Sequence, residues 1–156
     1  MIANNRYKQF SIDQQLIIRG ITIHNTHNAY SARENLQWME HSALNFAAHV
    51  FIDENEVVEA LPLARGCFHT GKAFDRGNQE TIAVEICRCT SSLSLYLEAQ
   101  KRAIHWIKKT LTANNLDQRA IFFHQDFDER AYCPHRIFEI YGNKQNFIEK
   151  ELNSCP

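Results

Sequence analysis

The sequence predicts an α/β (α+β) fold in which helices flank a central mixed β-sheet. Short runs rich in β-branched residues alternate loosely with longer segments of helical periodicity, an order typical of a sheet covered by helices. Two of the short runs are separated only by a polar turn and form a predicted hairpin, which argues against a purely parallel sheet. The chain of 156 residues has the length of one domain, so residues 1–156 are expected to form a single unit.

The first predicted strand leads into a helix. Residues 16–18 and 21–23 are β-branched runs, and the second is expected to be a buried strand. Ser31 and Glu34 have the spacing of a capping box, which predicts a helix over residues 32–44. The residues expected on its inward face are Leu36, Trp38, Met39 and Ala43.

The middle of the chain contains the hairpin, a polar segment and a further strand. Residues 47–52 and 56–62 are two apolar runs joined by Asp-Glu-Asn, which predicts a β-hairpin. Residues 72–80 are polar and are expected to form a loop. Residues 81–87 are a predicted strand that contains a single acidic residue.

The last part of the chain is expected to alternate helix, strand and helix. Residues 93–113 carry apolar residues at helical spacing and charges on the other side, which predicts the longest helix. Residues 120–123 are the last predicted strand, and helices are expected again over 137–141 and 146–152. The apolar positions of the long helix are Tyr96, Ala99, Ala103, Ile107 and Leu111.

Composition and charge exclude several classes of partner. The net charge is -1 and the pI is near 6.7, so neither nucleic acid nor an anionic membrane is expected to bind. No apolar run reaches the roughly 18 residues that cross a bilayer. Residues 1–8 lack the apolar core of a signal peptide, so the protein is expected to be made in the cytoplasm. The five cysteines are odd in number and irregularly spaced, which favours reduced thiols over a disulfide framework.

A histidine and a cysteine on one short loop suggest a metal site. His124 and Cys133 are half of a tetrahedral zinc site, and His24, at the end of the apolar run over residues 21–23, is the expected third ligand. Three protein ligands and one open position are typical of a catalytic Zn²⁺ rather than a structural one. Each residue alone is more simply explained by packing, and only the combination at strand ends favours a metal.

Glu85 is the second unusual residue, because it is an acid within an apolar strand. By strand alternation it shares a face with Ala83 and Cys87, so it is either solvent-facing or directed toward the predicted metal. In the second case it would take a proton from attacking water and return it to the leaving amine.

Three further histidines are candidates to line the same cleft as substrate-binding residues. They are His49, His69 and His135. His69 is on an expected loop, whereas His49 lies in an apolar strand, where a packed histidine is the simpler interpretation. A rival mechanism makes Cys133 a nucleophile with a histidine as its base, but the following Pro134 suits metal ligation better.

Five short motifs, taken in order, resemble the zinc-dependent N-acetylmuramoyl-L-alanine amidases. This amidase-2 group includes phage endolysins, bacterial autolysins and the peptidoglycan recognition proteins. The resemblance covers about residues 15–141, and it is specific because all five motifs occur in the family's order. The motifs are residues 23–26, 48–53, 68–71, 82–87 and 124–136.

The resemblance implies a fold, a cofactor and a reaction. His24, His124 and Cys133 match the family's three Zn²⁺ ligands, and Glu85 matches the general base of the endolysin branch. The implied reaction is hydrolysis of the amide between N-acetylmuramic acid and L-alanine of the stem peptide. The implied partner is therefore bacterial peptidoglycan, on which a monomer would act after release to the cell wall.

One departure from the family pattern concerns the oxyanion. Many members have a lysine two residues before the ligand cysteine, where this chain has Ala131, and the loop after His124 is one residue longer than expected. Arg130 is the candidate to replace the lysine's charge as a catalytic residue. The alternative function is a non-catalytic peptidoglycan-binding module on the same fold, which Ala131 favours and which Cys133 and Glu85 oppose.

Overall fold

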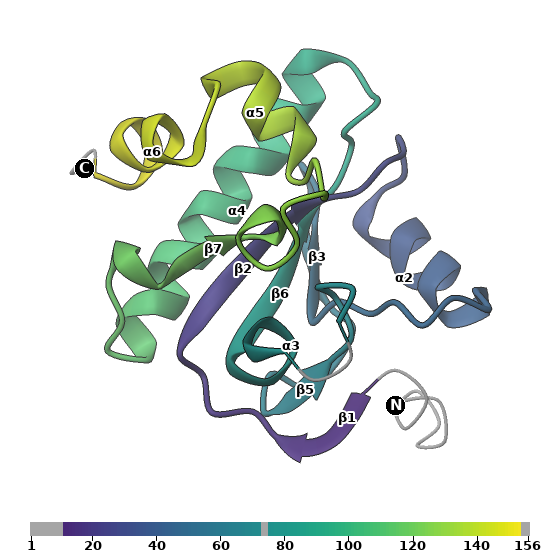
Figure 1. Ribbon diagram of the computed structural model, residues 1–156. Coiled ribbons are helices and arrows are strands. Elements are labelled where there is room, and N and C mark those ends of the chain that lie inside the picture. The colour runs from purple at the N-terminus through teal and green to yellow at the C-terminus, as the bar shows by residue number, and fades with distance from the viewer. Residues whose placement is uncertain (1–10, 73–74, 154–156) are drawn as a thin grey trace.

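The computed structural model describes residues 11–72 and 75–153, and a five-stranded mixed sheet lies at its centre (Figure 1). The strand order is β4–β3–β6–β2–β7, with β3, β6, β2 and β7 parallel and β4 antiparallel at one edge. The predicted mixed sheet and its hairpin, β3–β4, are confirmed. The bounds are β2 Gly20–Asn25, β3 Val50–Ile52, β4 Val57–Glu59, β6 Thr81–Ile86 and β7 Ile121–Phe123.

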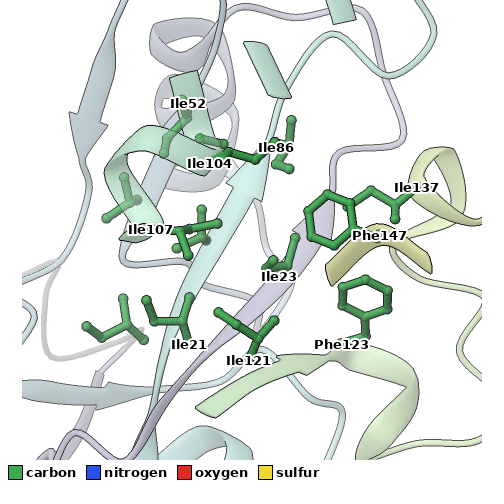
Figure 2. Close-up of a cluster of buried hydrophobic side chains, with 14 of the residues drawn as sticks. Ile21, Ile23, Ile52, Ile86, Ile104, Ile107, Ile121, Phe123, Ile137 and Phe147 are labelled. Atoms are coloured by element: carbon green, nitrogen blue, oxygen red, sulfur yellow. The ribbon is translucent and has the colours of Figure 1, made fainter. Parts of the chain in front are cut away.

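The long helix α4 (Leu93–Ala113) covers one face of the sheet and has the predicted bounds. It packs on β2, β3 and β6, and alternation along these strands directs their isoleucines and valines toward it (Figure 2). Each buried Ile or Phe contributes roughly 1.5–3 kcal/mol to folding. This face is therefore the main hydrophobic core. The labelled members are Ile21, Ile23, Ile52, Ile86, Ile104, Ile107, Ile121, Phe123, Ile137 and Phe147.

The C-terminal segment closes the same core. Helix α5 (His135–Tyr141) is followed by α6 (Lys144–Phe147) and the π-helical turn η3 (Ile148–Leu152), which confirms helix in both predicted regions. Phe147 is fully buried, and its ring lies 5.8 Å from that of Phe123 at the end of β7. The segment after the last strand is thus held against the sheet.

Helix α2 (Ala32–His41) packs beside β3 and β4 on the second, smaller core. The predicted capping box is present: the Ser31 N–H donates to Glu34 Oε2 at 2.7 Å, and the Glu34 N–H donates to Ser31 Oγ at 3.3 Å. The helix ends earlier than predicted, because Ser42 is extended and its hydroxyl accepts from the Leu44 N–H at 3.1 Å. Of the predicted inward residues, Leu36 and Met39 pack inward, whereas Trp38 and Ala43 are exposed.

Two further elements differ from the sequence-based expectations. Strand β1 (Ser11–Gln15) was not predicted, and it pairs antiparallel with β5 (Arg65–Cys67) in a small separate sheet. The polar segment over residues 72–80 contains a short helix, α3 (Arg76–Glu80), capped by the Asp75 side chain. A five-residue helix shows no periodicity, and a pairing between distant strands leaves no local pattern, so neither could be read from the sequence.

Candidate metal centre

Three neighbouring parallel strands bring functional side chains to one edge of the sheet. His24 on β2 and Glu85 on β6 are Cα partners in the register of the two strands. Both follow the alternation that points away from α4, because their neighbours Ile23, Val84 and Ile86 belong to the main core. On the other side of β2, strand β7 ends at Phe123, and His124 follows as the first residue of a 3₁₀ turn, η2 (His124–Asp126).

Cys133 reaches this edge from the loop after η2. Its peptide bond to Pro134 is cis, and α5 begins directly afterwards. The Asn25 side chain at the end of β2 accepts hydrogen bonds from the backbone N–H groups of Arg136, at 2.9 Å, and Ile137, at 3.3 Å. The start of α5 is thereby anchored to the strand that carries His24, which fixes Cys133 next to that histidine.

The predicted metal ligands are brought together. One ligand atom from each of His24, His124 and Cys133 lies within 4.8 Å of the other two. Cys133 Sγ is 3.7 Å from His24 Nδ1. A tetrahedral Zn²⁺ with Zn–S near 2.3 Å and Zn–N near 2.0–2.1 Å separates such a pair by about 3.5 Å. These three residues could therefore hold one metal ion with little rearrangement.

The protonation states of the three residues suit the binding of a cation. Burial, with the neighbouring His69 and His124, holds the pKa of His24 well below its usual range, and burial also lowers the pKa of His124. Both imidazoles are thus neutral near pH 7, the form that binds metals. Burial, helped by the Glu85 charge, raises the pKa of the Cys133 thiol to about 12. A neutral thiol is a poor nucleophile, which weighs against the cysteine-hydrolase alternative.

Glu85 is buried beside this cluster rather than solvent-facing. It is 3% exposed, and its Oε2 has no hydrogen-bond partner among the described residues. Burial raises the pKa of its carboxyl to about 8. A carboxyl that titrates near neutral pH and lines the same groove as the metal ligands has the properties of a general base.

The groove has a volume of about 720 Å³, in the range of ligand-binding sites. Four of the nine large apolar side chains that are exposed in the described residues line it, which marks the groove as a binding surface. The sequence pattern of α2 did not predict this binding surface. It placed Trp38 on the inward face of the helix, whereas Trp38 lines the groove. The four are Tyr30, Trp38, Leu44 and Tyr132.

The three histidines expected to contact substrate occupy different places. His49 is fully buried: its Nε2–H donates to the Arg65 carbonyl at 2.6 Å, and its Nδ1 accepts from the Ala83 N–H at 2.8 Å. This position is outside the groove lining and gives His49 a structural role. His69 is also buried, with both ring nitrogens hydrogen-bonded. His135 stacks on the groove residue His27 at 4.4 Å between ring centroids.

Arg130 does not enter the groove. Its side chain is 86% exposed and forms an ion pair with Asp128 at 3.0 Å. Ala131, the next residue, does line the groove. The expected replacement of the family lysine by Arg130 is therefore not seen in this arrangement, because the guanidinium is drawn to the carboxylate outside.

The fold and the site together define a class: a small α/β domain with a His–His–Cys cluster that could hold a metal ion, in a groove at the ends of parallel strands. The model of the N-acetylmuramoyl-L-alanine amidase family, Amidase_2, matches residues 14–136. The chain belongs to this family. The matched segment contains every residue of the cluster described above.

Individual relatives agree with this assignment. The chain is 36% identical over 136 residues to the N-acetylmuramoyl-L-alanine amidase XlyB of Bacillus subtilis (strain 168), a match that covers 85% of this chain and 43% of the relative. It is 35% identical over 118 residues to the amidase CwlA of the same organism, covering 75% of this chain and 43% of CwlA. The chain thus spans less than half the length of these curated relatives.

Solved structures have the same architecture. The structure of PlyL superposes with a TM-score of 0.87 at 26% identity, covering 96% of this chain and 92% of PlyL. The solution structure of the PlyG catalytic domain superposes with a TM-score of 0.87 at 25% identity, covering 98% of this chain and 91% of that one.

The described part of this chain has no helix long and apolar enough to cross a membrane.

Proposed function

We propose that this chain is the catalytic unit of a zinc-dependent N-acetylmuramoyl-L-alanine amidase of the endolysin or autolysin kind. The substrate is bacterial peptidoglycan, and the bond cleaved joins N-acetylmuramic acid to L-alanine of the stem peptide. The observation that carries the proposal is the buried, unpartnered carboxylate of Glu85 beside the cluster of His24, His124 and Cys133. Family membership and the curated amidases among the relatives support it.

Zn²⁺ is the proposed metal. Two imidazoles and one thiolate are a donor set that zinc prefers, and the sulfur–nitrogen distance of 3.7 Å suits tetrahedral ligation. When bound by His24, His124 and Cys133, the ion would polarise a carbonyl and lower the pKa of water toward ~7. The site has room for a fourth ligand, because the groove opens onto it.

Glu85 is the proposed general base. Its carboxylate takes a proton from the attacking water while the water oxygen bonds to the carbonyl carbon of the lactyl group. The carbon–nitrogen bond then breaks, and Glu85 returns the proton to the nitrogen that leaves as the amino terminus of L-alanine. Burial raises the pKa of this carboxyl to about 8 in the metal-free chain, and a bound cation would lower it, so that the carboxylate form is available to accept the proton.

The groove walls are suited to the sugar part of the substrate. Tyr30, Trp38 and Tyr132 present aromatic surface, and the residues that line the groove include no lysine or arginine. Aromatic faces pack well against the apolar faces of neutral sugars, whereas a charged stem peptide would favour cations. All the proposed residues come from one chain, so a monomer is sufficient for the reaction.

The test is cleavage of purified Gram-positive peptidoglycan by the zinc-loaded chain, with zinc content measured on the same sample. We expect one zinc per chain and new L-alanine amino termini that disappear after chelation and return with zinc. Glu85→Gln, which keeps the shape of the side chain, is the matched inactive control. Zinc with binding but no cleavage in the parent chain would instead support the non-catalytic recognition module.

A further inference from the structure

A second histidine, His69, forms a hydrogen bond with the ring of His24. His24 Nε2 lies 3.0 Å from His69 Nδ1, and His69 Nε2 lies 3.1 Å from the Gly77 carbonyl oxygen. A carbonyl oxygen only accepts, so His69 Nε2 carries the hydrogen and, in the neutral ring, His69 Nδ1 is the acceptor. His24 must then donate from Nε2, which leaves the lone pair of His24 Nδ1 facing Cys133 Sγ.

The backbone of Thr70, the residue after His69, also influences His124. Burial lowers the pKa of the His124 imidazole, and hydrogen bonding to the Thr70 backbone opposes that shift. The segment His69–Thr70 therefore hydrogen-bonds His24 directly and acts on the charge of His124.

Asn78 fixes this segment in turn. Its Oδ1 accepts from the His69 N–H at 2.8 Å and from the Thr70 N–H at 3.0 Å, while the Thr70 hydroxyl donates to the Asp75 carboxylate at 2.6 Å. Asn78 is fully buried, which makes these bonds costly to lose. One amide oxygen thus determines where both outer partners lie.

Helix α3 supplies the carbonyl group that accepts the hydrogen bond from His69. The Gly77 carbonyl accepts from the Thr81 hydroxyl at 2.7 Å as well as from His69. A Cβ at Gly77 would collide with the Thr70 side chain and meet Phe127 at 3.1 Å, so only glycine allows this approach. The short helix that shows no sequence periodicity has a defined place in the site.

We propose that His69 and Thr70, positioned by Asn78 and by the Gly77 carbonyl, form the outer coordination sphere of the metal centre. His69 selects Nδ1 of His24 as the metal ligand and fixes that imidazole ring before a metal binds. This inference rests on the proposed metal site and makes His69 a positioning residue, not a substrate contact. Outer partners of this kind typically change metal affinity by ~10–100-fold.

The test compares His69→Phe, which keeps a ring and removes both nitrogens, with His69→Asn, whose side-chain oxygen restores an acceptor near Nδ1. The control is His49→Phe, which changes an equally buried histidine that contacts no metal ligand through a hydrogen bond. Zinc affinity is measured by chelator competition with zinc alone. We expect it to fall ~10–100-fold in His69→Phe, to recover largely in His69→Asn and to stay at the parent value in His49→Phe.

A second readout needs no metal. Nitrogen NMR of the metal-free parent should show His24 as a single neutral tautomer with hydrogen on Nε2, and His69→Phe should give a mixture of tautomers. An unchanged His24 tautomer with unchanged zinc affinity in His69→Phe would overturn the inference. A parent chain that binds no zinc would contradict the proposed function, and the NMR comparison would still decide whether His69 orients His24.

Discussion

His24 and Glu85 face each other as Cα partners on the parallel strands β2 and β6, and both side chains are buried on the face opposite α4. An imidazole and a carboxyl could form an ion pair at such a position, yet Glu85 Oε2 has no partner among the described residues. The His24 ring is instead directed to His69 and Cys133. The strand register thus keeps a base free beside a histidine that is oriented to bind a metal.

Removing that base tests its role most directly. Glu85→Gln keeps the volume of the side chain but cannot accept a proton, so we expect kcat to fall by ~10²–10⁴-fold. The zinc content should stay at the parent value, because the ligand atoms belong to His24, His124 and Cys133. Elemental analysis and amide-cleavage assays on the same preparations give both numbers. Loss of zinc in the variant would make Glu85 a ligand instead of a base.

The raised pKa of Glu85 also predicts a pH dependence of stability in the metal-free protein. Burial raises this pKa from 4.5 to about 8, so between these values the folded state binds a proton that the unfolded state does not. The contribution to the free energy of unfolding is therefore complete below 4.5 and is lost as the pH rises through about 8. The slope reaches at most ~1.4 kcal/mol per pH unit.

The measurement is chemical denaturation of the metal-free parent and of metal-free Glu85→Gln between roughly pH 5 and pH 9. The comparison isolates the contribution of the Glu85 carboxyl to the unfolding free energy, because the other titrating groups are common to both proteins. The difference in unfolding free energy should change steadily in favour of the variant as the pH rises, and then level off. Two parallel curves would show that the carboxyl does not carry the proton assigned to it.

Much of this centre was predictable because its residues lie where strands end. His24 and His124 follow apolar runs that become neighbouring parallel strands, and alternation alone placed Glu85 on a face with Ala83. Cys133 could be assigned only as a partner for these histidines, since its position depends on the Asn25 contacts to α5.

The supporting parts could not be predicted from the sequence. The role of His69 depends on which ring nitrogen carries hydrogen, and that is set by the Gly77 carbonyl of a helix too short to show periodicity. Trp38 fits the apolar pattern of a core residue, but α2 turns it toward the groove. These outcomes are set by tertiary contacts, which override local pattern.

Zinc binding should release protons. Burial raises the pKa of Cys133 to about 12, so its thiol is protonated at roughly neutral pH. The thiol must lose that proton before the sulfur can bind the metal. Calorimetric titrations with zinc in buffers of different ionisation enthalpy should detect about one proton released from this residue. Cys133→Ala should lose that release along with most of the affinity, while Glu85→Gln should keep it. Equal release from the parent and Cys133→Ala would show that the sulfur is not a ligand.

Trp38 should contribute to substrate binding instead of folding. Its side chain is 41% exposed and lines the groove, whereas Leu93 on α4 is 50% exposed and does not. We expect Trp38→Ala to raise KM by about 2–10-fold, which corresponds to the ~0.5–1.5 kcal/mol of an aromatic contact. Leu93→Ala is the matched control and should leave KM unchanged. Equal effects of the two substitutions would mean that the aromatic wall does not contact substrate.

Position 131 decides whether the site lacks an oxyanion donor. Ala131 lines the groove, while Arg130 is 86% exposed and paired with Asp128, so the site as arranged has no cation at this point. We expect Ala131→Lys to raise kcat, because one oxyanion donor is worth up to ~10²–10³ in rate. Ala131→Met, of similar length without the charge, is the control and should give no increase. If Arg130→Ala reduced kcat as strongly as a lost donor, the guanidinium would have to leave Asp128 and enter the groove when substrate binds, and Ala131→Lys would then add little.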